Sequence, residues 1–447
     1  WDILRRFLIY SDYKVKYVQN FTDIDDKILK RAKEENSSMN EVSEKNITEF
    51  HKDMDALGIM RPDSMPKATN HICNICSFIK VLEDKGFAYA RGGDVYYSVF
   101  KNKNYGKLSN QNILEQNINQ QGRITTDESN KKENPQDFAL WKKAKENEPS
   151  FDSPWGKGRP GWHIECSAMV KDELGETIDI HLGGSDLIFP HHENEIAQSE
   201  SANNKKLANY WLHNGMVNVN GQKMSKSLKN FTTIRDLLDS GTSPMTLRYF
   251  VLTVNYRKPL DFTDEALRSA SEAWKNINVA LSFLDITKKE NLSIEINETN
   301  EFIEEKYKDM INYEISQKKI KFTNALNNDL NTAGAIAIIY ELAKPLKNFI
   351  NQFQRIKNLE INTNEKFHLR ETFKTLEELT DVLGLKKEEI IIDNRINEDQ
   401  ILSLINKRLV AKKEKDYAEA DKIRNSLKEK GVELIDQSPE LTTWVRI

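Results

Sequence analysis

Three side chains with metal-binding chemistry occur in the middle of the 447-residue sequence. His191 and Glu195 follow Pro190, a residue that suits the first turn of a helix, and their spacing of four would place both on one helix face. Cys166 could add a sulfur ligand. Imidazole, carboxylate and thiolate together suit zinc, and three protein ligands would leave one position open. The alternative is that these residues are structural. In either case His192 would point off the ligand face, as a packing or supporting residue.

Two other groups resemble metal sites less well. His71, Cys73 and Cys76 are close together, but no second cysteine or histidine pair is nearby, and the apolar residues around them follow a helical period. We therefore predict that both cysteines are core-facing or neutral. The segment His192–Ile196 lacks the second histidine of the HExxH zinc protease motif, which argues against a peptidase.

A short basic loop has the composition of a phosphate site. The segment Met216–Val219 and the following Asn220-Gly221 are typical of a β-hairpin, which would lead into Lys223-Met224-Ser225-Lys226-Ser227. Two lysines three positions apart, with two hydroxyls, could stabilise the charge that develops on a leaving pyrophosphate. A solvated loop is the alternative, but this five-residue string at a strand-to-helix junction is more specific than scattered lysines.

The elements that must position these residues alternate between strand and helix up to Arg235. β-Branched and aromatic runs predict strands, and 3.6-residue periods predict helices between them, which implies a parallel sheet with covered faces. Beyond Arg235 the strand signals stop, and Ser243-Pro244 begins a helical pattern. The polar stretch from Lys101 to Asn134 is predicted to be a mobile excursion. The predicted strands are Val15–Asn20, Asp94–Phe100, Ile178–Leu182 and Trp211–Val219, and the predicted helices are Thr69–Lys85, Pro190–Ala202 and one from Lys27.

Charge and cysteine content limit the classes of function. Lys plus Arg number 65 and Asp plus Glu 69, a net charge of −4, so any nucleic-acid contact must use a local patch. Residues 402–431 carry nine basic and five acidic side chains, an excess of 9 − 5 = +4, although a solvated helix face would look the same. Three cysteines form no disulfide framework, which predicts a reducing, cytoplasmic location. No apolar run reaches the roughly 18 residues that a membrane-spanning helix needs.

Several motifs resemble a known family. Lys223–Ser227 is the KMSKS signature of class I aminoacyl-tRNA synthetases. Three surrounding strings, 20–27, 155–169 and 183–195, resemble cysteinyl-tRNA synthetases, and the likeness continues at 329–332, 415–421 and 442–444. The resemblance covers nearly the whole chain.

The resemblance implies an α/β fold in which a Rossmann-type parallel-sheet catalytic domain precedes all-α helical-bundle and small C-terminal anticodon-binding domains. The expected boundaries are 1–222 for the catalytic domain with a connective-peptide insertion at about 62–150, 223–290 for the KMSKS loop and stem-contact region, 300–390 for the bundle, and 400–447 for the anticodon domain.

It also implies a reaction in which ATP, used with Mg²⁺, and L-cysteine form cysteinyl-adenylate, from which the cysteinyl group passes to tRNA(Cys). A monomer and one zinc ion per chain are expected. The residues carried over are Cys166, His191 and Glu195 as zinc ligands; Lys226, with Lys223, Ser225 and Ser227, for ATP; Gly184 and Asp186 on the nucleotide side; and Trp162, His181 and Thr22 around the substrate.

Two departures from the family pattern matter. The HIGH motif and one further zinc-binding cysteine belong upstream of Trp1, so the chain as written is expected to adenylate poorly and to hold zinc weakly. Lys229 stands where the family has glycine. The alternatives are a ligase of the same lineage that passes cysteine to an amino sugar, and a non-catalytic tRNA-binding relative.

Overall fold

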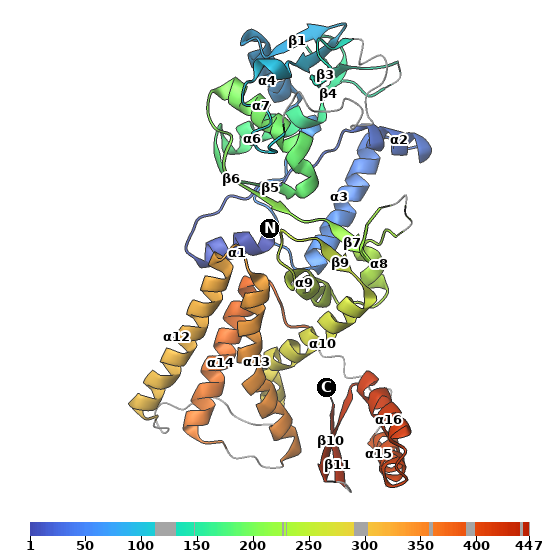
Figure 1. Cartoon of the computed structure of the whole chain (residues 1–447), viewed down its shortest axis with the longest axis vertical. Helices are drawn as coiled ribbons and strands as arrows, with labels where there is room; N and C mark the ends of the chain where they lie inside the picture. Colours follow the sequence, from blue (N-terminus) through green and yellow to red (C-terminus); the bar gives the residue numbers. More distant parts are fainter. Residues whose placement is uncertain are drawn as a thin grey trace. The chain divides into compact units, whose positions relative to one another are not determined.

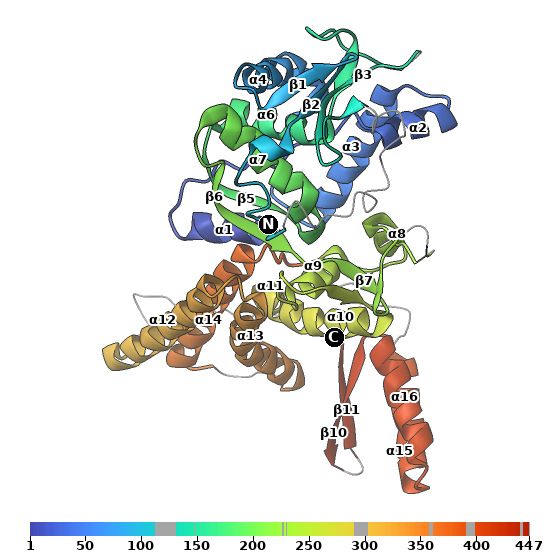
Figure 2. The same cartoon turned by 45° about the horizontal axis from the view of Figure 1, so that its top comes forward.

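The computed structural model describes residues 1–111, 131–146, 148–225, 228, 230–289, 303–356, 361–389, 398–438 and 441–446. The chain divides into two compact units: Trp1–Asp236 with Tyr256–Phe262, and Leu237–Asn255 with Thr263–Ile447. Figures 1 and 2 show their elements from two directions. Most of the predicted excursion at 101–134 lies outside the described residues.

The first unit combines three small sheets with helices. Strands β1 to β4 form an antiparallel sheet in that order, β5 and β6 are parallel, and β7 pairs antiparallel with β8 and parallel with β9. The helices are α1 (Asp2–Tyr10), α2 (Asp26–Glu34), α3 (Met39–Ala56), α4 (Ile72–Asp84), α6 (Trp162–Leu174) and α7 (Glu193–Asn203). The strands are β1 (Ala88–Arg91), β2 (Asp94–Tyr97), β3 (Phe138–Lys143), β4 (Gly158–Pro160), β5 (Ile178–Gly184), β6 (Ala208–Asn214), β7 (Val217–Val219), β8 (Gln222–Lys223) and β9 (Leu260–Phe262). Short 3₁₀ turns lie at Ala68–His71, Val99–Lys101 and Ser185–Leu187, and a π-helical turn lies at Ile188–His192.

One apolar core joins α4, α6 and α7 to the antiparallel sheet. Ile75 and Ile79 of α4, Trp141 of β3, Ile164 of α6 and Ala197 of α7 are all buried in it. Because α6 and α7 each bury one face here, the residues on their remaining faces are held in fixed positions. The parallel pair β5–β6, which α7 connects, is the strand–helix–strand arrangement that the sequence predicts.

Two strand predictions need correction. The segment Val15–Asn20 is extended but forms only one isolated parallel bridge, from Val18 to Ser64, and Phe21 directly after it forms another to Lys67. Its partner segment contains Pro62 and Pro66, which lack the N–H groups that a continuous ladder needs. The predicted strand Trp211–Val219 is two strands, because Gly215 leaves the ladder and approaches the backbone of Lys258, where a Cβ would lie 2.2 Å from the carbonyl oxygen.

The second unit is mainly helical. Helices α12, α13 and α14 pack side by side (Figure 1), and α10 packs against α9 and α13. Ser243 caps α9 through Thr246, as predicted. The elements are α9 (Pro244–Leu252), α10 (Asp264–Leu281), α11 (Phe283–Lys289), α12 (Glu305–Asn327), α13 (Thr332–Arg355), α14 (Thr363–Val382), α15 (Glu398–Lys413), α16 (Tyr417–Glu429), β10 (Val432–Ser438) and β11 (Leu441–Arg446), with α8 (Ile234–Asp239) at the boundary of the two units.

The prediction that strands end near residue 235 is wrong. Besides β9, an antiparallel hairpin of β10 and β11 follows α16. Val432 and Leu434 of β10 are buried against apolar side chains of α15 and α16. The alternation of Val432 and Leu434 with Glu433 was the available signal for this strand.

The structure also places the two other cysteines and one of the basic residues of the C-terminal part. Cys76 packs on the core and Cys73 is exposed, and neither belongs to a metal-like group among the described residues. Of the nine basic residues in 402–431, Arg408 is buried in an ion pair with Asp436 rather than on a solvated face. Within the described part of the chain, no helix combines the length and apolarity needed to cross a bilayer.

Candidate metal centre and active site

Three elements of the first unit bring the predicted metal ligands together. Cys166 lies on α6, His191 in the π-helical turn before α7, and Glu195 in the first turn of α7. Pro190 does not begin the helix as predicted but lies inside that turn. The spacing of four nevertheless holds, with His191 Nε2 3.0 Å from Glu195 Oε1.

The three donor atoms converge on one point. One atom each from Cys166, His191 and Glu195 lie within 4.8 Å of one another. Asn20 Nδ2 lies 3.6 Å from Cys166 Sγ. The donor set of one sulfur, one nitrogen and one oxygen is the one that zinc accepts, with room for a further ligand.

Glu195 supplies the observation that tests whether a metal fits. Its side chain is fully buried, yet Oε1 has no hydrogen-bond donor, because the contact to His191 lacks hydrogen-bond geometry. Burial acts to raise the pKa of Glu195, but His181 and His191 outweigh it and hold the pKa well below its usual range. A buried carboxylate oxygen without a donor is costly unless something else satisfies it. A cation between Glu195 and His191 would do so.

The pKa of Cys166 is raised, in contrast to that of Glu195, but it also indicates that a cation fits this site. Burial, with the nearby Glu195 and Glu165 carboxylates, raises the pKa of this thiol well above its usual value. In these surroundings the thiolate would form only with a cation beside it, and a coordinated metal ion provides that charge. The residues present therefore fit a zinc ion.

A chain of histidines supports the ligands. His181 Nε2 lies 2.9 Å from Glu195 Oε2, and His163 Nδ1 lies 2.9 Å from His191 Nδ1. His192 Nδ1 is hydrogen-bonded at 2.8 Å to His213 Nε2. Burial lowers the pKa of His192 to about 3, so this ring is neutral at physiological pH.

The sequence interpretation missed part of this chain. His163 and His213 carry no local spacing signal, because β6 and α6 bring them to the site from distant positions. His192 was expected to pack or support, and it also forms a second metal-like group with His181 and Glu195. A Cβ at Gly183 would lie 2.5 Å from His192 Cε1, so only glycine allows this ring to pack against β5.

The predicted substrate residues lie around this centre in two places. The ring of Trp162 lies 4.3 Å from that of His191, and His181 stacks on Trp211 with centroids 4.5 Å apart. Thr22 instead lines a groove between α2 and α3, two residues along the chain from Asn20, which reaches Cys166.

The predicted phosphate loop begins at the hairpin that the sequence indicates. Lys223 pairs with Asn218 across β7 and β8, and the turn residues Asn220 and Gly221 both have positive φ. Ser225 N donates to the side chain of Asn230 at 2.9 Å, which closes the loop behind the hairpin. The residues Lys226, Ser227 and Lys229 lie outside the described part of the chain.

Gly184 and Asp186 follow the same strand as His181. Gly184 ends β5, and a Cβ there would lie 2.5 Å from Asp186 Oδ1. The 3₁₀ turn Ser185–Leu187 follows the strand, at the edge where ligands of parallel sheets bind. Their role on the nucleotide side of the site stays a prediction.

Comparisons with known proteins match the chain to two domain families and to curated relatives. Residues 1–272 match the tRNA synthetases class I (C) catalytic domain, and residues 321–387 match the DALR domain. A cysteine–tRNA ligase of Prochlorococcus marinus subsp. pastoris (strain CCMP1986 / NIES-2087 / MED4) is 98% identical over 447 residues, which are 100% of this chain and 91% of the relative. The cysteine–tRNA ligase of Synechococcus sp. (strain CC9902) is 53% identical over 454 residues, covering 100% of this chain and 90% of its own.

Comparison with solved structures shows which fold the chain shares. Mycobacterium tuberculosis methionyl-tRNA synthetase bound by methionyl-adenylate superimposes with a TM-score of 0.59 at 14% identity, over 86% of each chain. This likeness supports the Rossmann-type architecture. By the domain match and by the identity to its relatives, the chain belongs to the class I tRNA synthetases, in the cysteine–tRNA ligase family.

Proposed function

We propose that the protein joins L-cysteine to tRNA(Cys) in two steps at the site described above. In the first, an oxygen of the cysteine carboxylate attacks the α-phosphorus of ATP, and pyrophosphate leaves. In the second, a hydroxyl of the terminal ribose of tRNA attacks the carbonyl carbon, and AMP leaves. Family membership supports this reaction, and the converging donors Cys166, His191 and Glu195 carry the choice of substrate.

The chemical problem is to separate cysteine from serine, which differ in one atom. An apolar pocket distinguishes such near-isosteres by only about 1 to 3 kcal/mol. Rejection by about 10⁴ requires roughly 5.5 kcal/mol. Zinc, when bound, supplies a soft Lewis acid that prefers a thiolate to a hydroxyl. The protein contributes the donors that would hold this ion, Cys166, His191 and Glu195, with Trp162 packed on His191 and Glu195 held by His181.

The phosphate loop is proposed to act in the first step. Lys223 and Lys226, with Ser225 and Ser227, would pair with the phosphate oxygens as charge develops on pyrophosphate. Lys226→Ala should slow pyrophosphate exchange by about 10²-fold, with little change in cysteine binding. An unchanged exchange rate would contradict this role.

The second unit favours tRNA over other acceptors. The DALR match at 321–387 supports the proposed helical-bundle domain at 300–390, and the α15–α16 hairpin with β10–β11 supports a separate small domain at 400–447. A ligase that uses an amino-sugar acceptor would not need these helices. A non-catalytic relative would not need the buried donors around Glu195. The cytoplasmic location and the monomeric state belong to the same proposal.

One assay separates these possibilities. The full-length protein, with its zinc content measured, is offered cysteine or serine with ATP and tRNA(Cys), and charged tRNA is counted. We expect cysteine to be preferred by at least about 10⁴-fold and zinc to be present at one ion per chain. Transfer to an amino sugar but not to tRNA would favour the first alternative. Absence of any cysteine-dependent pyrophosphate exchange would favour the second.

A further inference from the structure

A second set of metal-binding atoms shares the Glu195 carboxylate with the proposed zinc ligands. One donor atom each from His181, His192 and Glu195 lie within 4.8 Å of one another. The set contains neither Cys166 nor His191, the other two ligands of the first group. The reaction steps proposed above give His192 no chemical role.

The two oxygens of Glu195 face different imidazoles. Oε1 lies 3.0 Å from His191 Nε2, whereas Oε2 lies 2.9 Å from His181 Nε2. His192 Nε2 lies 4.0 Å from Oε1. A carboxylate has two oxygens with about four lone-pair sites between them. Glu195 can therefore serve a second ion through Oε2 while Oε1 serves the first.

The packing around His192 orients its ring like that of a metal ligand. Its Nδ1 forms a hydrogen bond of 2.8 Å with His213 Nε2. When His192 donates this hydrogen bond, its Nε2 carries a lone pair, which is the usual arrangement in metal-binding histidines. A Cβ at Gly183 would lie 2.5 Å from His192 Cε1, so the ring packs directly on the backbone of β5. The ring therefore has both an outer hydrogen-bond partner and a fixed orientation.

His181 completes the set from strand β5. Its ring stacks on Trp211 of β6 with an angle of 13° between the planes, and it lies 4.6 Å from the ring of His192. The side chain of His181 is 14% exposed, whereas those of His192 and Glu195 are 2% and 1% exposed. Solvent reaches the set from the His181 side, so a water molecule could take the remaining position of a metal ion.

We propose that His181, His192 and Glu195 form a second, weaker zinc site, whose occupation inhibits the enzyme when zinc is in excess. Two imidazoles and one carboxylate are an established ligand set for zinc. The site is weaker because its ion shares Glu195 with the first ion, and two dications close together repel each other. Its occupation inhibits because Glu195 Oε2 loses its contact to His181 and a second dication lies near the proposed thiolate position. The inhibitory effect rests on the proposed function, but the binding of the ion does not.

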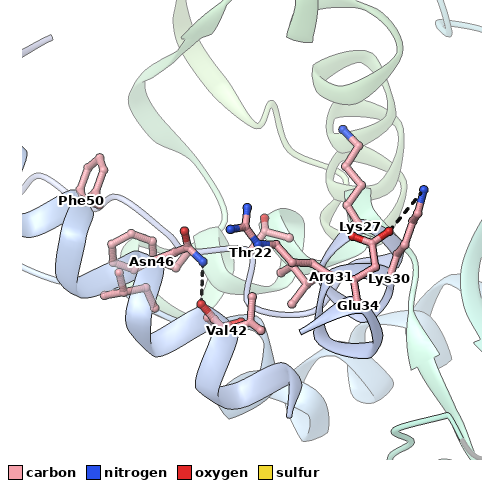
Figure 3. A pocket seen from close by; sticks show the side chains of 12 residues that line it. Thr22, Lys27, Lys30, Arg31, Glu34, Val42, Asn46 and Phe50 are labelled. Atoms are coloured by element: carbon pink, nitrogen blue, oxygen red, sulfur yellow. Dashed lines mark hydrogen bonds and ion pairs between the residues drawn. The ribbon is translucent and has the colours of Figure 1, made fainter. Parts of the chain in front are cut away.

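The described residues offer no comparable set elsewhere. Among them, only the two groups that share Glu195 bring three such donors together. The residues that line the groove between α2 and α3 include one carboxylate, that of Glu34, and neither imidazole nor thiol (Figure 3). His71 lies 3.3 Å from the carboxylate of Asp172 but has no third donor in the described part of the chain. We therefore expect a second ion to bind at His192.

The first test adds cobalt(II) to the full-length protein that already carries one zinc ion per chain. Zinc binds protein ligands more tightly than cobalt does, so the added cobalt should leave the resident zinc in place. We expect one cobalt ion per chain, with ligand-field absorption but no sulfur-to-metal charge transfer, because the donors are nitrogen and oxygen. Equilibrium dialysis against excess zinc should reach two ions per chain, with the second bound at least about 100-fold more weakly than the first.

Two substitutions should weaken the second ion and spare the first. His192→Gln removes a ligand, so the second ion should bind more than about 100-fold more weakly, while the first changes less than about 3-fold. His213→Phe removes only the hydrogen bond to His192 and should weaken the second ion about 10-fold. His368→Gln on α14 is the matched control, because His368 belongs to neither group, and it should bind both ions like the wild type.

Inhibition is measured as loss of cysteine-dependent pyrophosphate exchange while the concentration of free zinc is buffered. The wild type should be inhibited over the zinc concentrations at which the second ion binds. For His192→Gln, compared with its own rate at low zinc, the inhibiting concentration should rise at least about 10-fold. His368→Gln should be inhibited like the wild type, which corrects for zinc bound by ATP or pyrophosphate.

The proposal is overturned if zinc saturates at one ion per chain, or if the His192→Gln protein binds two ions as tightly as the wild type. Added cobalt that produces sulfur charge transfer also contradicts it, because that ion would lie at a cysteine. A second ion at His192 that leaves exchange unchanged would overturn the inhibitory effect. The proposed function fails separately, if the wild type with one zinc ion shows no cysteine-dependent exchange; the two titrations then still decide whether the second site exists.

Discussion

The carboxylates of Asp436 and Glu195 lie in different parts of the chain, and both have cationic or imidazole partners. They differ in whether both of their oxygens accept hydrogen bonds. Asp436 of β10 accepts hydrogen bonds at both oxygens, from Arg408, Lys412 and Thr442. Glu195 of α7 is satisfied at Oε2 by His181 but has no donor at Oε1. A fully satisfied carboxylate offers no oxygen to a ligand, whereas an unsatisfied carboxylate oxygen can accept a cation. The buried Nε of Arg408 also has no hydrogen-bond partner among the described residues, but it is a donor and cannot bind a metal ion.

Whether both oxygens of a carboxylate are satisfied distinguishes a candidate binding site from a structural ion pair better than burial does. Arg408 and Glu195 are both buried charged groups. Only around Glu195 do a thiol and a second imidazole approach the unsatisfied oxygen. We therefore interpret the Glu195 cluster as a binding site and the Asp436 cluster as a structural tie between α15 and the β10–β11 hairpin.

The largest expected effect comes from removing a metal ligand. Cys166→Ala should lower zinc affinity by more than about 100-fold, because loss of an outer hydrogen-bond partner alone typically lowers it 10- to 100-fold. Competition with a chelator followed by metal analysis measures the effect. Asp436→Asn is the matched control and should retain zinc like the wild type. Equal zinc retention in the Cys166→Ala protein would remove Cys166 from the ligand set.

The paired substitutions Asp436→Asn and Glu195→Gln should both lower stability but should differ in their effect on zinc binding. Asp436→Asn leaves the buried Arg408 guanidinium unpaired, and we expect a loss of about 2 kcal/mol in the stability of the C-terminal hairpin, less than for a deeply buried pair because Asp436 is 37% exposed. Glu195→Gln removes a carboxylate charge that His181 and His191 stabilise, as its lowered pKa indicates, so the metal-free protein should also lose stability, and zinc should be held more weakly.

Urea unfolding of the metal-free proteins checks this comparison. Glu414→Gln, at an exposed position in the same C-terminal part, serves as the control and should have little effect. Zinc retention by the Glu195→Gln protein equal to that of the wild type would mean that this carboxylate is structural.

The sequence predicted the centre of the site but not its support. A helical spacing and a family motif predict that Cys166, His191 and Glu195 converge, and one donor atom of each lies within 4.8 Å of the others. His163 and His213 could not be placed, because their contacts depend on how α6 and β6 pack rather than on any local pattern.

The fold was predictable to a similar degree. The β5–α7–β6 arrangement and the Lys223 hairpin follow from alternation and turn residues. The strand predicted at Val15–Asn20 fails because strand formation depends on a distant partner, here one interrupted by prolines. The β10–β11 hairpin was not predicted, because it directly follows a stretch of charged residues at helical spacing.

His181 tests whether the outer partner of Glu195 matters as its geometry implies. His181→Phe keeps the stacking on Trp211 but removes the hydrogen bond to Glu195 Oε2. We expect zinc affinity to fall about 10-fold, the lower end of the range for such partners. His213→Phe, which removes a hydrogen bond to His192 and not to a proposed ligand, should have a smaller effect in the same chelator competition. A reversed order would show that the chain through His192 is the main support.

The smallest effect is a pH dependence confined to the Asp436 cluster. Hydrogen bonding to Arg408, reinforced by Lys412 and Thr442, outweighs burial and holds the pKa of Asp436 far below its usual range. A group with a depressed folded pKa contributes stability above its unfolded pKa of about 3.9, and that stability is lost as the pH falls toward the folded value. The stability difference between wild type and Asp436→Asn should therefore be constant from about pH 5 to 7 and shrink below about pH 4. Hydrogen exchange in β10, corrected for the intrinsic rate at each pH, measures it locally. A difference that persists undiminished at pH 2 would mean that packing of the side chain, and not its charge, ties the hairpin to α15.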